Sequence, residues 1–298
     1  MMMSLDLRAR LACLYAGSVW GLFWIPLRGL DATGMHSLWV TVVYFGVPFI
    51  LLIPVMAFRF REILAGGGSL QLTAALSALA ITLYSISINF TDVIRVMLLF
   101  YLTPIWSALL ARAVLGEVIT PLRMIAMVLA VTGMLTIFGL GATFPLPGNI
   151  GDWMALIAGM IWAVAAVRLN RDSHLPSVDM TVIFIQWALI YSIVAVVMVA
   201  PGSGPDRAML TGVLPWLVPV IMIMIIPGTF ASLWGPKHLS PVLVGLLFMS
   251  EIVVGAISAS IFSGDPFGWR EVIGITLIAS ASLIEPLWSF IAGGKASS

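Results

Sequence analysis

The sequence predicts an all-α integral membrane protein with ten transmembrane helices, arranged as two inverted five-helix repeats around a central cavity. Hydrophobic residues make up 61% of the 298 residues and charged residues only 9%, against about 25% charged residues in an ordinary soluble domain. Apolar stretches of membrane-crossing length follow one another along the whole chain. A pattern in the first half returns about 148 residues later, which indicates an internal repeat.

The expected spans each hold ~19–24 residues, enough to cross a hydrocarbon core of about 30 Å with some tilt. Glycine and proline clusters at 66–69, 145–149, 201–205 and 264–266 separate several of them. No soluble domain is expected between them. In chain order the spans are 11–30, 36–58, 70–90, 94–114, 121–141, 150–169, 179–200, 211–234, 240–262 and 270–291.

The strongest internal match pairs the segments 95–117 and 243–265. Its informative parts are a Leu-Leu-Phe triplet and a closing glycine followed by an acid, because leucine and valine matches arise easily in apolar sequence. A weaker match pairs 16–20 with 158–162, which share the pattern Ala-Gly-x-x-Trp. Because five is an odd number, a second five-helix copy must enter the membrane from the opposite face. A pseudo-two-fold axis in the membrane plane is therefore expected.

Lysine and arginine residues predict the orientation of the chain. With the N-terminus inside, ten of the 14 basic residues fall on the inner side and four on the outer side. We therefore expect both termini in the cytoplasm and a location in the inner (plasma) membrane of a bacterium. The two domains are expected at 1–148 and 149–298.

Composition and motifs argue against several other classes of protein. The net charge of +1 does not favour binding to nucleic acid. A single cysteine, Cys13, rules out an internal disulfide. The glycine-rich segment 66–69 lacks the lysine of a phosphate-binding loop, and no metalloprotease or aspartyl-protease pattern occurs. We therefore expect no cofactor, no bound metal and no enzyme activity.

Several aromatic side chains are expected deep in the membrane, away from the interfaces where tryptophan usually lies. Trp20 and Trp24 fall within the first expected helix, and Trp162 is the repeat counterpart of Trp20. Tyr84 and Tyr101 bring hydroxyl groups into the apolar zone. As a set these residues predict a cavity suited to an amphipathic or aromatic solute. For each residue singly, plain helix packing is the alternative interpretation.

Glu251 is the only acid expected near the middle of a span, where a charge is costly. It would bind a substrate amino group or take a proton, or remain a neutral acid bonded to a neighbouring helix. Pro104 and Pro227 interrupt expected helices, so they are candidate hinges, with fixed kinks as the alternative. Pro104 cannot donate to the carbonyl of Phe100, which is left to face a cavity or to be satisfied by a neighbouring serine.

The residues Trp20-Gly21, the segment Tyr101-Leu102-Thr103-Pro104 and the pair Gly116-Glu117, within ten helices in two inverted halves, resemble the drug/metabolite transporter superfamily and its EamA-like members. The second copy carries Ser250-Glu251-Ile252, where many members have Glu-Pro, so the helix at 240–262 is expected to bend less. The YLTP segment, together with 161–163 and 231–234, is similar to the YddG-type aromatic amino-acid exporters.

This resemblance implies a transmembrane exporter of aromatic and other apolar amino acids that works by alternating access in the lipid bilayer. A transporter of another small metabolite or drug is the first alternative, and a channel or receptor-like protein is the second. Protons are candidate coupling ions, and the number of subunits is not predicted. The candidate substrate-binding residues are Trp20, Trp24, Tyr84, Tyr101, Trp162 and Glu251, and the candidate hinges are Pro104 and Pro227.

Overall fold

The computed structural model describes residues 4–88, 90–91, 93–116, 118–138, 147–262 and 268–294, and within them every regular element is a helix. The closing acids of the expected repeat, Glu117 and Asp265, lie outside these ranges. The first half contains α1 (Leu5–Gly21), α2 (Trp24–Asp31), α3 (Ser37–Phe58), α4 (Phe60–Ser87), α5 (Val93–Phe100), α6 (Thr103–Leu110), η1 (Ala111–Leu115) and α7 (Pro121–Phe138). The second half contains α8 (Ile150–Arg171), α9 (Ser177–Val199), α10 (Arg207–Val220), η2 (Ile221–Ile225), α11 (Ile226–Trp234), η3 (Gly235–His238), α12 (Pro241–Phe248), α13 (Ser250–Phe262) and α14 (Trp269–Gly294).

Eight helical stretches among the described residues are long and apolar enough to cross a membrane. The helix α7 is shorter, with an apolar part at Pro121–Ile137, and α14 is not among the eight. A protein that crosses the membrane several times is therefore confirmed, whereas ten spans stay a prediction. The eight stretches are Leu5–Asp31, Ser37–Phe58, Phe60–Ser87, Arg95–Leu115, Ile150–Arg171, Ser177–Val199, Arg207–His238 and Pro241–Phe262.

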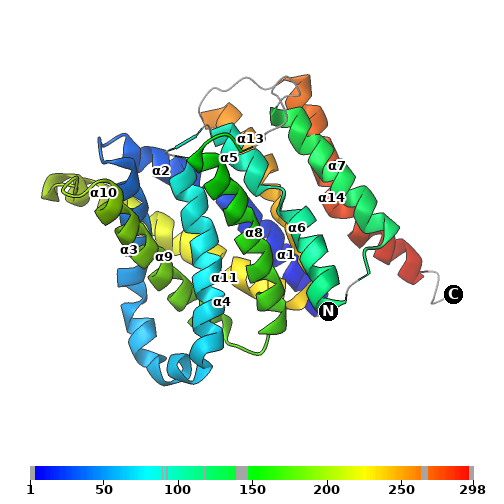
Figure 1. The fold of residues 1–298 in the computed structure, drawn as a ribbon, viewed down its shortest axis with the longest axis horizontal. Coiled ribbons are helices and arrows are strands. Elements are labelled where there is room, and N and C mark those ends of the chain that lie inside the picture. The colour runs from blue at the N-terminus through cyan, green and yellow to red at the C-terminus, as the bar shows by residue number, and fades with distance from the viewer. Residues whose placement is uncertain are drawn as a thin grey trace.

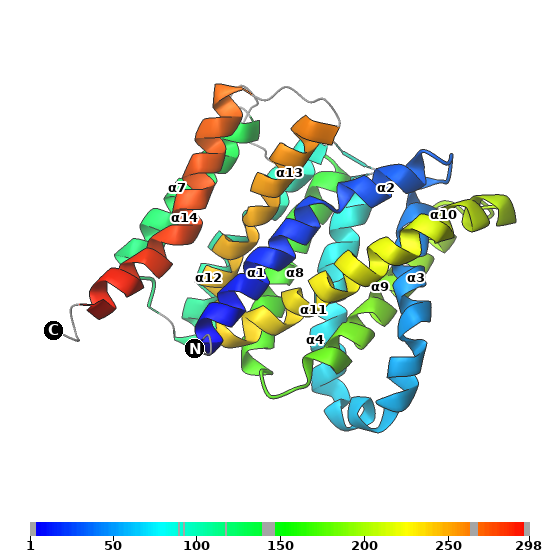
Figure 2. The ribbon, with the colours of Figure 1, turned by 180° about the vertical axis from the view of Figure 1, so that it is seen from behind.

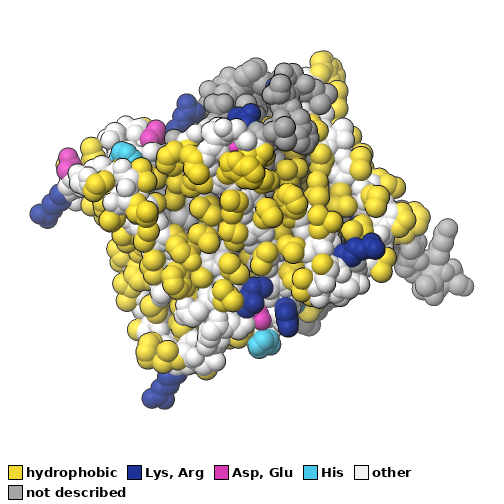
Figure 3. All heavy atoms as spheres, viewed as in Figure 1, with side chains coloured by type: hydrophobic (Ala, Val, Ile, Leu, Met, Phe, Trp, Pro, Cys, Tyr) yellow, Lys and Arg dark blue, Asp and Glu magenta, His cyan; other side chains and the backbone are white. Residues whose placement is uncertain are grey.

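The surface of the molecule is largely apolar. Hydrophobic side chains cover most of the face seen in Figure 3, while the charged groups visible there lie mainly towards its margins. Large side chains such as Met198 and Ile223 are 78% and 71% exposed. A surface of this kind is stable in lipid, because lipid tails are as apolar as the side chains that face them.

The helices stand side by side, with α7 and α14 paired at one edge of the molecule (Figures 1 and 2). The start of α1 and the end of α14 lie towards the same end of the bundle (Figure 1). The helix that opens each half packs along an interrupted helix of the other half: α1 against α12 and α13, and α8 against α5 and α6. Inverted repeats are expected to pack reciprocally in this way, although the repeat relation itself stays a prediction.

Three of the expected helices are interrupted, each beside a residue whose ψ is close to zero, at the edge of the helical region. These residues are Leu22 between α1 and α2, Leu102 between α5 and α6, and Met249 between α12 and α13, with ψ of −4°, −2° and −9°. The second and third interruptions follow Phe100 and Phe248, which the internal match aligns. The interruption after Phe248 occurs without a nearby proline, so proline is not required for it.

One expected boundary needs correction. The first span is not continuous over 11–30, because α1 ends at Gly21 and α2 starts at Trp24. The range of α4 holds two helices that meet at a kink in the glycine cluster: Gly67 has φ 54° and ψ −150°, a conformation that glycine adopts without a steric penalty. The break expected at 66–69 therefore precedes the third span.

Candidate functional site

A buried cavity lies between α1, α4, α5, α6, α8, α12 and α13, so both halves of the chain contribute to its wall. Its volume is about 40 Å³, room for a few water molecules at ~10–15 Å³ each. Five of the six candidate binding residues line it, together with the candidate hinge Pro104: Trp20, Tyr84, Tyr101, Trp162 and Glu251. The other lining residues are Phe23, Ile81, Phe100, Thr103, Gly245 and Phe248.

The structure places Trp24 outside this group. Its indole nitrogen Nε1 donates to Ser258 Oγ at 3.0 Å, and the guanidinium carbon of Arg28 lies 5.9 Å from its ring centroid. The interruption at Leu22 changes the helical phase, so residues after the break no longer share the face of Trp20. The expectation that Trp24 lines the cavity is therefore corrected. The hinge candidate Pro227 lies in the first turn of α11, after the π-helical turn η2.

The sequence analysis did not select three phenylalanines that line the cavity: Phe23, Phe100 and Phe248. A signal for two of them was present, because Phe100 and Phe248 are the aligned residues of the Leu-Leu-Phe triplet. Phe23 reaches the cavity because the first helix is interrupted beside it. The signal for this interruption was Pro26, which cannot donate to the carbonyl of Leu22.

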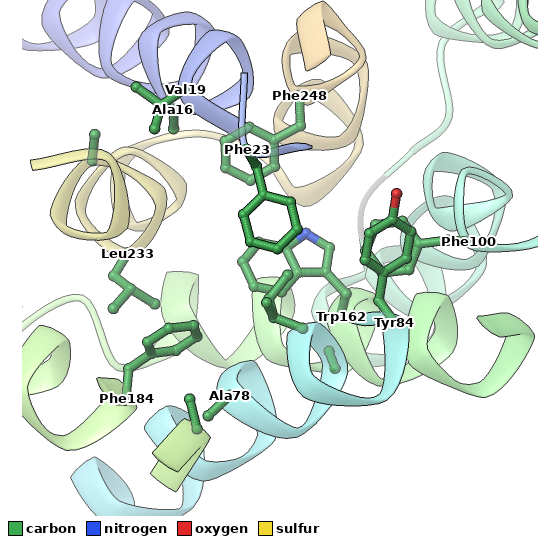
Figure 4. Close-up of a cluster of buried hydrophobic side chains, with 14 of the residues drawn as sticks. Ala16, Val19, Phe23, Ala78, Tyr84, Phe100, Trp162, Phe184, Leu233 and Phe248 are labelled. Atoms are coloured by element: carbon green, nitrogen blue, oxygen red, sulfur yellow. The ribbon is translucent and has the colours of Figure 1, made fainter. Parts of the chain in front are cut away.

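The aromatic rings of the cavity form contacts between helices, as Figure 4 shows. Tyr84 of α4 lies 4.6 Å from Phe100 of α5, measured between ring centroids. Trp162 of α8 lies 5.8 Å from Phe248 of α12. Such tilted pairs suit aromatic rings, whose edges carry positive and whose faces carry negative partial charge. The rings therefore hold the wall of the cavity together.

Two of the polar side chains at the cavity are paired within the protein. Trp20 Nε1 donates to Ser232 Oγ at 2.8 Å. Thr103 Oγ1 donates to the carbonyl of Phe100 at 2.5 Å, which satisfies the group that Pro104 leaves without a helical donor. The buried hydroxyl of Tyr101 interacts with Glu251 electrostatically, yet no hydrogen bond of ordinary geometry reaches it within the described structure. Within the described structure, the polar groups left for a solute are therefore those of Tyr84, Tyr101, Trp162 and Glu251.

Two glycines let neighbouring backbones come close to the helix interruptions. A Cβ on Gly159 of α8 would lie 2.6 Å from the carbonyl oxygen of Phe100. A Cβ on Gly17 of α1 would lie 2.2 Å from Ser250 Oγ and 3.0 Å from the carbonyl oxygen of Phe248. The internal matches align both glycines with each other and both carbonyls with each other, so the same close approach occurs twice.

A buried ion pair joins the two halves where α5 and α8 begin. Arg95 Nη2 lies 2.5 Å from Asp152 Oδ2, and the side chain of Asp152 is fully buried. The same carboxylate accepts hydrogen bonds from Thr91 Oγ1 at 2.8 Å and from the backbone nitrogen of Gly148 at 2.9 Å. This network fixes the outer end of the half-helix α5, whose other end reaches the cavity at Phe100.

A second polar network joins the halves at the opposite ends of these helices. Arg59, between α3 and α4, pairs with Asp179 of α9. Asp172 at the end of α8 accepts a hydrogen bond from Thr73 Oγ1 of α4 at 2.6 Å, and Lys237 Nζ donates to the carbonyl of Leu175 at 2.6 Å. The cavity therefore lies between two polar networks that each cross from one half of the chain to the other.

Substitution of Ser232 by alanine is expected to lower the free energy of unfolding by ~1–3 kcal/mol, because it leaves Trp20 Nε1 without its partner. Thermal or denaturant unfolding of the purified protein in detergent measures this difference. The matched control is Ser280→Ala, since Ser280 is exposed and donates only to the carbonyl one turn earlier in α14. Equal unfolding midpoints for both variants would contradict the expectation.

Known proteins share features with this chain in both sequence and fold. Residues 7–139 match the EamA-like transporter family, a family of membrane transporters within the drug/metabolite transporter superfamily and not of enzymes. No curated protein matches the chain. A solved structure described as "Crystal structure of protein" is 17% identical, with a TM-score of 0.72, and the similarity covers 95% of this chain and 98% of that one. At this identity the structural similarity shows the fold alone. The family match of the first half is what supports a transporter of small molecules.

Proposed function

We propose that the protein moves small organic solutes across the membrane by alternating access to the central cavity. The observation that carries the proposal is a cavity whose wall is built from both halves of the chain, at the points where α5/α6 and α12/α13 are interrupted. Interrupted helices at membrane depth are tolerated where they are buried in protein or line a cavity. Secondary transporters place their substrate sites at such interruptions.

The size of the cavity supports a carrier over an open pore. With about 40 Å³ of space, the site has to open before it admits an organic solute. Opening towards one side at a time requires helices of the two halves to move against each other. Pro104 packs against Gly245 across the halves, since a Cβ on Gly245 would lie 3.3 Å from Pro104 Cα. Pro104 and Pro227 remain our candidate hinges for this motion.

Export of aromatic amino acids is the specific form of the proposal that the sequence resemblance favours. The aromatic wall supports an aromatic or apolar side chain. The lining residues include no Lys, Arg or His that would pair with the carboxylate of an amino acid. Another small metabolite is therefore supported equally well. A bacterial inner-membrane location with both termini in the cytoplasm is part of the proposal and rests on the distribution of basic residues.

Counterflow in liposomes tests the proposal. The purified protein is reconstituted, the liposomes are loaded with one solute of a panel of amino acids, amines and other metabolites, and uptake of the labelled solute is followed. At least one solute is expected to show saturable counterflow. Trp162→Ala should reduce it ~10-fold or more, because a buried aromatic wall of the site is lost.

The control for this experiment is Trp288→Ala, because Trp288 is 61% exposed on α14. It should leave counterflow unchanged. A flux that does not saturate and shows no counterflow would indicate a channel. No flux of any solute through folded protein would contradict transport altogether.

A further inference from the structure

We infer that the solute carried in the central cavity is an organic amine in its cationic form, held by the Glu251 carboxylate and the surrounding aromatic faces. The inference rests on the proposed function and names its substrate class. A zwitterionic amino acid fits the same cavity poorly, for reasons of charge.

The charge of the cavity wall has one sign only. Glu251 is the only carboxylate among the lining residues, which include no basic side chain. The basic residues nearest in sequence to the wall are engaged elsewhere: Arg95 is bonded to Asp152, and Arg28 lies over Trp24 outside the cavity. A substrate carboxylate would therefore be buried beside a second carboxylate with no counter-charge, which is unfavourable.

The helix ends at the cavity do not supply the missing positive charge. At each interruption the C-terminus of one half-helix adjoins the N-terminus of the next, so their opposite partial charges largely cancel. In α6, Pro104 has no N–H to offer an anion. Thr103 donates its hydroxyl hydrogen to the Phe100 carbonyl. The donors left at the wall are neutral tyrosine hydroxyls and the Trp162 indole N–H, which bring no positive charge to a substrate carboxylate.

A cation meets better partners. Trp20, Trp162, Tyr84 and Phe248 surround the cavity with π systems, whose negative faces attract ammonium groups, most strongly when water is excluded. The Tyr101 hydroxyl is buried without a hydrogen-bond partner among the described residues, and its lone pairs accept an ammonium N–H. Together with the Glu251 carboxylate, these groups offer an amine both a counter-charge and an acceptor.

Three probes that share a phenyl ring and a short chain test the charge preference. Phenethylamine is the cation, phenylalanine adds a carboxylate to it, and 3-phenylpropionate is the anion without the amine. Binding is measured by tryptophan fluorescence in detergent, and transport by counterflow in liposomes. Phenethylamine is expected to bind ~10-fold or more tightly than phenylalanine, because only phenylalanine buries an unpaired carboxylate. The anion is expected not to bind.

Variants at Glu251 test whether its carboxylate causes the preference for a cationic amine. Glu251→Gln keeps the shape of the side chain and removes its charge, so phenethylamine affinity should fall ~10-fold or more. Glu251→Asp keeps the charge and should retain part of the affinity. Glu62→Gln makes the same chemical change at an exposed residue in the first turn of α4, and should leave binding unchanged. Folding of each variant is checked by size-exclusion chromatography and by the protection of the buried thiol of Cys13.

The outcomes separate this inference from the proposed function. Phenylalanine binding as tightly as phenethylamine, no phenethylamine response in either assay, or full affinity in folded Glu251→Gln would each overturn the cationic substrate. The proposed transport function would still stand if any solute of the broader panel showed saturable counterflow. Absence of counterflow for the whole panel would overturn both.

Discussion

Replacing Asp152 with asparagine should lower the free energy of unfolding by about 3–5 kcal/mol, the cost of leaving one member of a buried ion pair without its partner. The carboxylate is fully buried and pairs with Arg95. It also accepts hydrogen bonds from Thr91 and Gly148. Asparagine has about the same shape but only one acceptor oxygen, so it removes the negative charge beside Arg95 and turns an N–H group towards donors.

The lone cysteine provides the measurement. Cys13 is buried, so a thiol-reactive fluorophore labels it only as the protein unfolds, and the midpoint of labelling on heating reports stability. The control is Asp6→Asn, which breaks the pair of Arg10 with an Asp6 side chain that is 58% exposed and should cost less than ~1 kcal/mol. Equal midpoints for the two variants would show that the Asp152 network does not stabilise the fold.

Substitution of Gly159 by valine should cost about 3 kcal/mol, the upper end of the usual range for an overpacked site. The first carbon of any side chain there would lie 2.6 Å from the Phe100 carbonyl oxygen and 3.2 Å from Thr103 Oγ1. Backbone cannot move aside as a flexible side chain does. The variant therefore has to push α8 away from the interruption between α5 and α6, which also displaces Trp162 from the cavity wall.

Both stability and solute binding are expected to fall in Gly159→Val, and the same labelling and fluorescence assays measure them. Gly212→Ala is the control, because a Cβ at Gly212 would have no neighbour within 4 Å. Alanine is the better helix former by about 1 kcal/mol, so this control should be as stable as the wild type or more so. A Gly159→Val protein with unchanged stability would mean that the close approach is not required.

The sequence predicted the class of fold well, because membrane helices leave a strong signal in composition and length. It also predicted most of the cavity. Trp20 and Trp162 were found through the repeated Ala-Gly-x-x-Trp pattern, and Glu251 through the cost of an acid within a span. Each of these signals comes from a local feature of the chain that the surrounding fold does not alter.

Two features of the site escaped the sequence analysis. The interruption of the first helix at Leu22 has a local cause that was overlooked, because Pro26 cannot donate to the Leu22 carbonyl four residues before it. As a result, Phe23 lines the cavity and Trp24, which was expected there, does not. The pairing of Arg95 with Asp152 was not predicted either, because the two residues are 57 positions apart in the chain.

The position of the half-helix α5 has a consequence for the order in which the helices assemble during synthesis. α5 packs mainly on α8, and its Arg95 finds Asp152 there. Because α8 is synthesised later, α5 is made before Asp152, the carboxylate that its Arg95 binds in the finished protein. The first half cannot reach its final arrangement until the ribosome has completed α8, so the last step of assembly must wait for the second half of the chain.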